Sequence, residues 1–256
     1  MDILSSKAGG ILTIEFNRLE RKNAITAVMY QAMADAITDA EGDDSVRAIL
    51  ITGKPEIFTA GNDLDDFLKN SGSGTLEDRP VFQFMRALSG ASKPVVAAVS
   101  GAAIGIGTTL LLHCDLVYAA DNAKFSLPFA QLGLCPEFAS SALLPHVAGH
   151  ARAAEKLMLG EPFLAQEAYD MGLVSKVLPA ADVLAHAQAQ AAKLVALPAS
   201  SIRTTKRLMK AGRAEIVPAA MSVESKLFGE MLQAPEAKEA FTAFFEKRKP
   251  DFSKYC

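Results

Sequence analysis

The sequence has no tryptophan and only three cysteines among its 256 residues. The cysteines are few and irregularly spaced, which excludes a small fold held together by disulfides. No apolar run approaches the roughly 18 residues of a membrane-spanning helix. The first residues lack the basic and apolar segments of a secretory signal, and the last three are not the Ser-Lys-Leu peroxisomal address. We therefore expect a cytoplasmic protein.

An excess of charge of either sign is also missing. The 26 Lys and Arg residues nearly balance the 29 Asp and Glu residues, for a net charge of −3. This argues against binding of nucleic acid or of an anionic membrane through bulk charge, so an anionic ligand has to be held by local groups. Hydrophobic residues make up 50% and charged residues 21% of the chain, as in ordinary globular proteins.

Strand and helix patterns alternate up to about residue 180. Residues 11–16 alternate apolar and polar side chains, as a half-buried strand does, and a helix is expected after Thr26, a favourable N-cap. Further strands are expected at 46–52, 94–99, 116–119, 124–126 and 173–178, with a helix at 108–114. The alternation predicts an α/β protein with a largely parallel sheet.

The pattern becomes entirely helical near residue 197. We predict a core of residues 1–197 and a helical region of residues 198–256, in which Pro235 suits the first turn of the last helix. The aromatic side chains of that region suggest packing against another subunit. Residues 70–80, rich in glycine and serine, are predicted to form a surface loop, which is either a lid or a plain connection.

Several catalytic motifs are absent. Gly105-Ile106-Gly107 lacks the third glycine of a dinucleotide fingerprint, and no Gly-x-Ser-x-Gly elbow exists. His146 and His150 lack the intervening glutamate of a zinc protease, and we predict no metal site. His113 is interpreted as a partly buried residue with a hydrogen-bond partner.

Two glycine-rich segments remain, residues 58–64 after one buried strand and residues 100–107 after another. Each segment would present free backbone N–H groups at the end of a sheet, and the second would also point a helix N-terminus there. Two N–H donors that converge on one point form an oxyanion hole. The alternative is a pair of tight turns that need glycine only for their backbone conformation.

The chain resembles the crotonase (enoyl-CoA hydratase/isomerase) superfamily over essentially its whole length. The resemblance is carried by Arg-Lys-Asn-Ala-Ile at 21–25, the two glycine segments, Lys-Pro-Val-Val-Ala-Ala-Val at 93–99, Cys-Asp-Leu-Val-Tyr-Ala at 114–119 and Phe-Phe-Glu-Lys-Arg-Lys-Pro at 244–250. It implies a spiral of ββα units followed by a C-terminal helical trimerisation region, and a homotrimer or a dimer of trimers.

The resemblance also assigns roles to residues. The backbone N–H groups of Asn62 and Ile106 would bind a thioester oxygen. The coenzyme A part of the substrate would be held by Lys22, Ala24, Ala60, Gly61, Asn62, Asp63 and Leu64, and Phe244 and Lys247 would approach the coenzyme A of a neighbouring subunit. No separate cofactor is implied, because coenzyme A belongs to the substrate. For the basic residues, a solvated face remains the alternative.

The acid and base residues decide which reaction a family member performs. Hydratases of the family use two glutamates, and this sequence has Thr109 and Phe129 at those positions. Glu137, in Pro-Glu-Phe-Ala-Ser-Ser, resembles the single catalytic base of the peroxisomal-type Δ3,Δ2-enoyl-CoA isomerases. The resemblance therefore implies an isomerase that converts a 3-enoyl-CoA into the trans-2-enoyl-CoA. The alternative reading of Glu137 is an exposed loop carboxylate or a neighbour of a helix N-cap.

Two other functions stay open at this point. One is an enoyl-CoA hydratase or another acyl-CoA enzyme of the same fold. The other is a non-catalytic module that binds acyl-CoA or RNA, with polyanion contacts from Arg203, Lys206, Arg207, Lys210 and Arg213. The negative net charge favours a solvated face for these five residues.

Overall fold

The computed structural model describes residues 1–66 and 78–255. Most of the loop predicted at residues 70–80 lies outside the described residues, although Pro80 begins helix α3 (Pro80–Gly90). Within the described ranges, no helix is both long and apolar enough to cross a membrane.

Ten strands of the described chain form two sheets. The first sheet has six strands, in the order β1 (Ile3–Ala8), β2 (Ile11–Phe16), β3 (Ala48–Thr52), β5 (Val95–Val99), β7 (Leu116–Ala120) and β10 (Lys176–Leu178). The second has four, in the order β4 (Ile57–Thr59), β6 (Ala102–Ile104), β8 (Lys124–Ser126) and β9 (Phe163–Leu164). Pairing is parallel except between β1 and β2 and between β8 and β9.

Successive strands alternate between the sheets. Strands β3, β5 and β7 lie in the first sheet, and each is followed by a strand of the second, β4, β6 or β8. Helix α3 connects β4 to β5, and α4 (Ile106–Thr109) with a 3-10 turn (Leu110–His113) connects β6 to β7. Each turn of the chain thus adds one strand to each sheet, which confirms the predicted α/β spiral of ββα units.

The local predictions hold for most elements. Leu12, Ile14 and Phe16 are buried on one side of β2, and β3 is buried along its whole length. Helix α1 (Ala27–Gly42) begins after Thr26, whose hydroxyl oxygen accepts a hydrogen bond from the Met29 N–H at 3.3 Å.

Two predicted elements are shorter than expected. The helix predicted at 108–114 is a short α-helix that continues as a 3-10 turn. The strand predicted at 173–178 is confined to β10, because the N–H groups of Leu173 and Val174 both donate to the Ala168 carbonyl. These bonds close the end of helix α7 (Ala165–Asp170) and delay the start of the strand.

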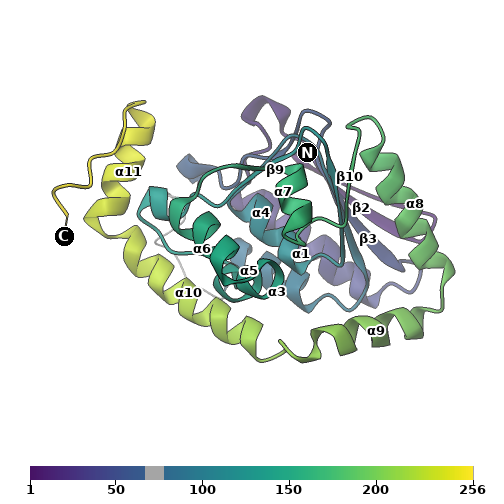
Figure 1. Ribbon diagram of the computed structural model, residues 1–256. Coiled ribbons are helices and arrows are strands. Elements are labelled where there is room, and N and C mark those ends of the chain that lie inside the picture. Colours follow the sequence, from purple (N-terminus) through teal and green to yellow (C-terminus); the bar gives the residue numbers. More distant parts are fainter. Residues whose placement is uncertain (67–77, 256) are drawn as a thin grey trace.

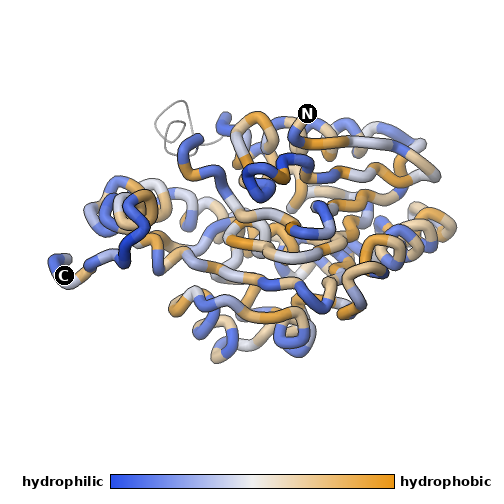
Figure 2. Tube along the Cα trace, turned by 90° about the horizontal axis from the view of Figure 1, so that it is seen from above, coloured by the Kyte–Doolittle hydropathy of each residue, from blue (hydrophilic) through white to orange (hydrophobic). Residues whose placement is uncertain are grey.

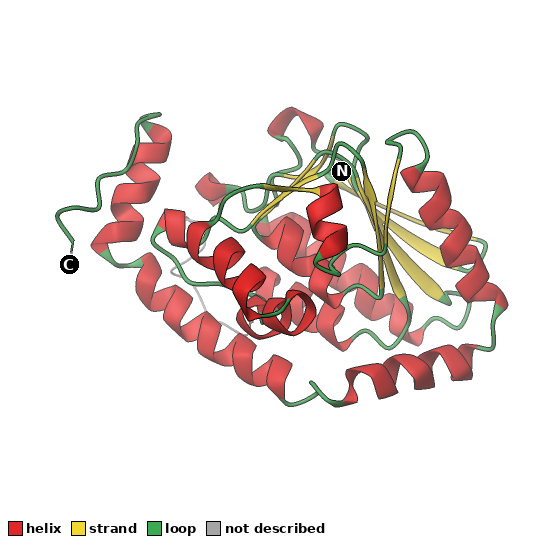
Figure 3. Cartoon of the chain, in the orientation of Figure 1, coloured by secondary structure: helices red, strands yellow, loops and turns green. Residues whose placement is uncertain are grey.

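Helices cover both faces of the six-stranded sheet (Figures 1 and 3). Helix α8 (Val183–Ala196) packs Val183, Ala187 and Ala191 against one face. The other face joins the main core with α1, α3 and the second sheet. Helices α5 (Ser140–Ala148) and α6 (His150–Leu159) extend this core away from α8.

The C-terminal helices run along the outside of the core (Figure 1). They are α9 (Ala199–Ala211), α10 (Ile216–Leu232) and α11 (Pro235–Phe245), and Pro235 lies in the first turn of α11 as predicted. Helix α8 ends at Ala196 and α9 begins at Ala199, and the division of the chain into two regions at residue 197 stays a prediction. Figure 2 shows hydrophobic residues along the strands and a largely hydrophilic chain after α11.

Candidate active site

The two glycine segments lie side by side because β4 and β6 pair in parallel. Ile57 is opposite Ala102 and Thr59 is opposite Ala103, so the turns after both strands begin at the same edge of the sheet. A Cβ atom on Gly61 would lie 2.8 Å from the Ile104 carbonyl oxygen, and Gly61 has a φ of +86°. Only glycine allows the two turns to approach this closely.

These turns present two backbone N–H groups without partners. Within the described chain, neither the Asn62 nor the Ile106 amide donates a hydrogen bond. The amides beside them do, since Gly61 N–H donates to Thr59 Oγ1 at 3.1 Å and Gly105 N–H donates to the Ser126 carbonyl at 2.9 Å. The unpaired amides are therefore available to an oxyanion.

Hydrogen bonds from side chains of other elements hold the Asn62 turn in place. The Tyr30 hydroxyl donates to Asn62 Oδ1 at 2.5 Å. Asp63 is only 4% exposed, and its carboxylate accepts a hydrogen bond from Arg18 Nη1 at 2.7 Å. Burial opposes ionisation of Asp63, but this bond and the one from the Asp66 N–H hold its pKa below the usual range. The Asp63 side chain is therefore an anchor for the turn.

The carboxyl group of Glu137 is buried, and it faces the same region as the two turns. It is 8% exposed, and its Oε1 atom has no hydrogen-bond partner in the described chain. Burial, followed by the negative charge of Glu224, raises its pKa from 4.5 to about 8. The alternative of an exposed loop carboxylate is wrong, because the loop turns Glu137 into the protein.

The loop after Glu137 has an unusual backbone. Phe138 and Ala139 both have left-handed φ angles, +58° and +56°, which cost about 1–3 kcal/mol each in residues other than glycine. The Phe138 ring stacks on His113 at 3.8 Å, and His113 Nε2–H donates to the Phe138 carbonyl at 2.8 Å. Burial lowers the pKa of His113 to about 3, so His113 is a neutral structural residue. It is fully buried, deeper than predicted.

A third contact to this loop comes from α10. The Glu224 carboxylate accepts hydrogen bonds from the Ala139 N–H at 2.6 Å and from the Ser141 N–H at 3.0 Å. Sequence reasoning missed Glu224, because it was only one glutamate in an amphipathic helix.

A cavity of about 900 Å³ joins the glycine turns to Glu137. Among the residues predicted to form the site, it is lined by Ala24, Ala60, Gly61, Asn62, Asp63, Leu64, Ile106, Glu137 and Phe244. Lys22 and Lys247 do not line it. The Lys22 carbonyl instead accepts a hydrogen bond from the Ala60 N–H at 3.0 Å and so shapes the first turn.

Three other basic residues lie along this cavity, and the roles predicted for Lys22 and Lys247 stay predictions. Arg21, Arg248 and Lys249 line it. Arg248 is held by Glu239 and Glu246, and Arg21 lies 3.3 Å from Asp65. The aromatic wall includes Phe228, Phe245 and Phe252 besides Phe244 and the predicted Phe129. The C-terminal helices thus form one side of the site.

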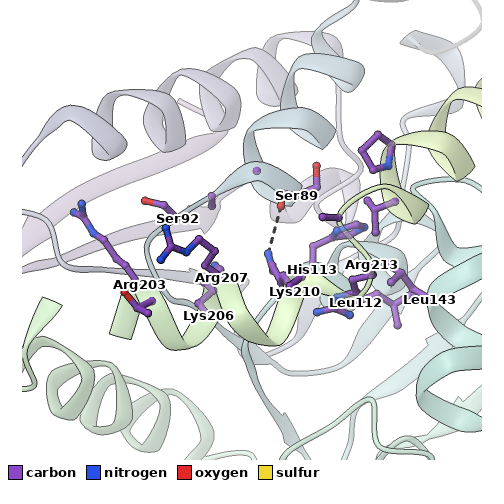
Figure 4. Close-up of a pocket in the computed structure, with 17 residues that line it drawn as sticks. Ser89, Ser92, Leu112, His113, Leu143, Arg203, Lys206, Arg207, Lys210 and Arg213 are labelled. Atoms are coloured by element: carbon purple, nitrogen blue, oxygen red, sulfur yellow. Dashed lines mark hydrogen bonds between the residues drawn. The ribbon is translucent and has the colours of Figure 1, made fainter. Parts of the chain in front are cut away.

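A second cavity, of about 680 Å³, lies between α3 and α9 (Figure 4). The five basic residues named as polyanion contacts all line it. Lys206 pairs with Asp115 at 2.7 Å, and Lys210 Nζ donates to the Ser89 carbonyl at 3.3 Å. Its described lining holds no Asp or Glu residue. Polyanion binding stays a prediction.

The first cavity therefore combines two N–H donors with one buried base. Such a site can remove a proton from carbon while negative charge develops on a nearby oxygen. In the part of the chain that the structure describes, no group of three or more His, Cys, Asp or Glu residues could hold a metal ion.

Comparison with known proteins gives concordant matches. A family model described as "Enoyl-CoA hydratase/isomerase" matches residues 6–255. "Enoyl-CoA delta isomerase 2" of Rattus norvegicus is 36% identical over 252 residues, which cover 96% of this chain and 64% of the rat protein. "Probable enoyl-CoA hydratase" of Bacillus subtilis (strain 168) is 35% identical over 234 residues, 90% of both chains. The crystal structure of an enoyl-CoA hydratase/isomerase from Pseudoalteromonas atlantica T6c has a TM-score of 0.94 and 41% identity, and the match covers 98% of this chain and 100% of that one.

Proposed function

This chain belongs to the enoyl-CoA hydratase/isomerase family, and we propose that within it the protein is a Δ3,Δ2-enoyl-CoA isomerase. The observation that carries the proposal is the state of Glu137, a buried carboxyl with an unpartnered Oε1 in the cavity that the Asn62 and Ile106 amides line. The rat relative, which is named as a delta isomerase, supports this choice.

The reaction is a proton transfer between two carbons. The ionised Glu137 takes a proton from C2 of a 3-enoyl thioester, and the electron pair moves onto the thioester oxygen. The N–H groups of Asn62 and Ile106 stabilise this oxyanion. When the carbonyl re-forms, the double bond lies between C2 and C3, and C4 receives the proton from Glu137. The carboxylate is regenerated, and the product is the conjugated 2-enoyl thioester.

The raised pKa of Glu137 suits this role. A carboxyl group with a pKa of about 8 is a stronger base than an ordinary one once it is ionised. Burial, the main cause of the shift, also strengthens the interaction of the enolate with the two amides. Ketosteroid isomerase follows the same logic, since a carboxylate base works there beside an oxyanion site.

The residues at the two hydratase positions support isomerisation over hydration. Thr109 is fully buried, and its hydroxyl donates to the Ile106 carbonyl at 3.5 Å. Phe129 presents an apolar ring to the cavity. Neither side chain can deprotonate a water molecule.

The substrate and the assembly belong to the same proposal. We propose that coenzyme A enters as part of the thioester and that no separate cofactor is used. A homotrimer or a dimer of trimers is supported by apolar side chains exposed on α9 and α10, namely Leu208, Met209, Ile216 and Val223. The cytoplasmic location stays a prediction.

The test uses 3-hexenoyl-CoA and the absorbance of the conjugated 2-enoyl thioester. Glu137→Gln is expected to lower kcat by about 10³-fold or more, because it removes the base while keeping the side-chain shape. Glu230→Gln, an exposed position on α10, is the matched control and should keep full activity.

Two results would contradict the isomerase. One is hydration of crotonyl-CoA as fast as the wild-type isomerisation, which would favour a hydratase. The other is no turnover of 3-enoyl-CoA substrates of any chain length.

A further inference from the structure

Glu224 is a glutamate buried in the middle of helix α10. Its side chain is 5% exposed, although glutamate is rarely buried without partners. Its Oε2 atom accepts a hydrogen bond from the Ala139 N–H, and its Oε1 atom accepts from the Ser141 N–H and from the Ser141 hydroxyl at 2.5 Å. These donors lie at the end of the loop that carries Glu137, at Ala139, and in the first turn of α5, at Ser141.

These bonds add to those that the segment makes within itself, in which the Ser140 N–H and hydroxyl donate to the Glu137 carbonyl at 3.1 and 2.6 Å. The N-cap of α5 is Ala139, whose side chain cannot accept a hydrogen bond from the first amides of the helix. Ala139 and Phe138 are also both in the left-handed region. Glu224 supplies the missing acceptor from another helix, 85 residues away from Ala139 in the sequence. The position of Glu137 therefore depends on α10.

Glu224 also places a charge beside Glu137. Burial raises the pKa of both carboxyl groups, but three donors stabilise the ionised form of Glu224, whereas Oε1 of Glu137 has none. Glu224 therefore loses its proton first, and its charge opposes ionisation of Glu137.

Charged side chains of Asp63, Arg21, Arg248 and Lys249 line the same cavity, but Glu224 is the charge that contributes to the pKa of Glu137. Three further titratable groups near the Glu137 loop, Tyr30, His113 and Cys135, carry no charge near neutral pH. Burial, with a smaller contribution from Glu137, raises the pKa of Tyr30 on α1. Burial lowers the pKa of His113 to about 3 and raises the pKa of Cys135 to about 11. Glu224 is therefore the charged group that raises the pKa of Glu137 besides burial.

We propose that Glu224 is a positioning residue for Glu137, which holds the backbone of its loop and sets the charge beside its carboxyl group. The proposal rests on the proposed isomerase function. The sequence assigned the C-terminal helical region to oligomerisation. Under this proposal, helix α10 of that region is also a functional part of the site in its own chain.

The experiment separates the two roles with two substitutions. Glu224→Asp keeps the charge but withdraws the carboxylate by one methylene, so it disturbs the position of the loop. Glu224→Gln keeps the length but removes the charge, and its amide nitrogen cannot accept a hydrogen bond. Glu230→Gln, on the exposed side of the same helix, controls for the loss of one charge.

Both Glu224 variants are expected to lower kcat for 3-hexenoyl-CoA by about 10- to 100-fold through misplacement of the base, with KM changed much less. The rise of kcat/KM with pH reports ionisation of Glu137 in the free enzyme. Its midpoint should move about one pH unit lower in Glu224→Gln and stay in place in Glu224→Asp. Glu230→Gln should match the wild type.

An unchanged kcat in both variants would overturn the proposal. So would a lower kcat in Glu224→Gln with an unchanged pH midpoint, because that result describes a merely structural residue. If Glu224→Gln does not fold, Glu224→Asp and the milder Ser141→Ala carry the test, since each should lower kcat while leaving the midpoint unchanged. Wild-type kcat in both would overturn the proposal.

The pH dependence of the unfolding free energy needs no substrate and separates this proposal from the isomerase function. The titration of Glu137 should appear there and move to lower pH in Glu224→Gln. If the wild type turns over no 3-enoyl-CoA but this shift is present, the proposed function fails and the coupling of the two carboxyl groups stands. If turnover is present without the shift, the coupling fails alone.

Discussion

The turns that carry Asn62 and Ile106 and the loop that carries Glu137 reach one cavity by different means. The turns are placed by backbone pairing of β4 with β6 and by a glycine at the closest approach. The Glu137 loop has no glycine at its two left-handed residues and is held by side chains of His113 and Glu224. The donors therefore depend on local backbone chemistry, and the base depends on distant packing.

This difference explains how one site provides both rigid donors and a strained base. Pairing of β4 with β6 fixes the directions of the backbone amides at the ends of these strands, and the side chains of Tyr30, Arg18 and Thr59 add support to the Asn62 turn. A carboxyl group becomes a strong base only when the protein buries it and leaves an oxygen unpaired, which lowers stability. The Glu137 loop is therefore the part of the site that loses stability, and Glu224 and His113 hold that loop in place.

The largest expected effect concerns the free energy of unfolding and Glu137. The folded protein keeps the Glu137 proton up to about pH 8, whereas the unfolded chain releases it near 4.5. Stability therefore falls as pH rises between these values. Glu137→Gln has no proton to lose and should be more stable than the wild type at pH 9 by on the order of 5 kcal/mol.

Urea unfolding at pH 5 and pH 9 checks this prediction. The difference between Glu137→Gln and the wild type should be small at pH 5, because this pH lies only slightly above the pKa of the glutamate in the unfolded chain. An equal difference at the two pH values would show that Glu137 does not titrate in this range.

The next effect concerns the donors. Gly61→Ala would place a Cβ atom 2.8 Å from the Ile104 carbonyl oxygen, at a φ that alanine disfavours. We expect the turns to move apart and kcat to fall by about 10²- to 10³-fold, as for the loss of one oxyanion donor. Gly42→Ala is the control, because nothing lies within 4 Å of its Cβ position. Wild-type kcat in Gly61→Ala would show that the donors do not depend on this contact.

The smallest effect concerns the Tyr30 hydroxyl behind Asn62. Tyr30→Phe removes the hydrogen bond to Asn62 Oδ1, and we expect a loss of about 1 kcal/mol of stability with a modest decrease in kcat. Thermal unfolding and 3-hexenoyl-CoA turnover measure the two quantities. A decrease in kcat as large as that in Gly61→Ala would mean that side chains, too, determine the position of the donors.

The sequence alone was informative where interactions are local. The alternation of apolar residues in β2, the Thr26 N-cap and Pro235 at the start of α11 each act within a few residues, so their patterns predicted the elements. The same holds for the two glycine segments, whose backbone freedom marks both turns. The shortened β10 was not predictable in this way, because the bonds that delay it depend on how helix α7 ends.

The sequence by itself indicated the α/β alternation and the two glycine turns, and its resemblance to the family implied the spiral and a glutamate at the position of the isomerases' base. Only the tertiary structure decided that Glu137 is buried, that Arg21, Arg248 and Lys249 line the cavity, and that Glu224 accepts hydrogen bonds from Ala139 and Ser141 beside Glu137. The physical reason is the range of the interactions. Backbone preferences are encoded by neighbouring residues, whereas burial and charge coupling arise when helix α10 packs against a loop that lies far from it in the chain.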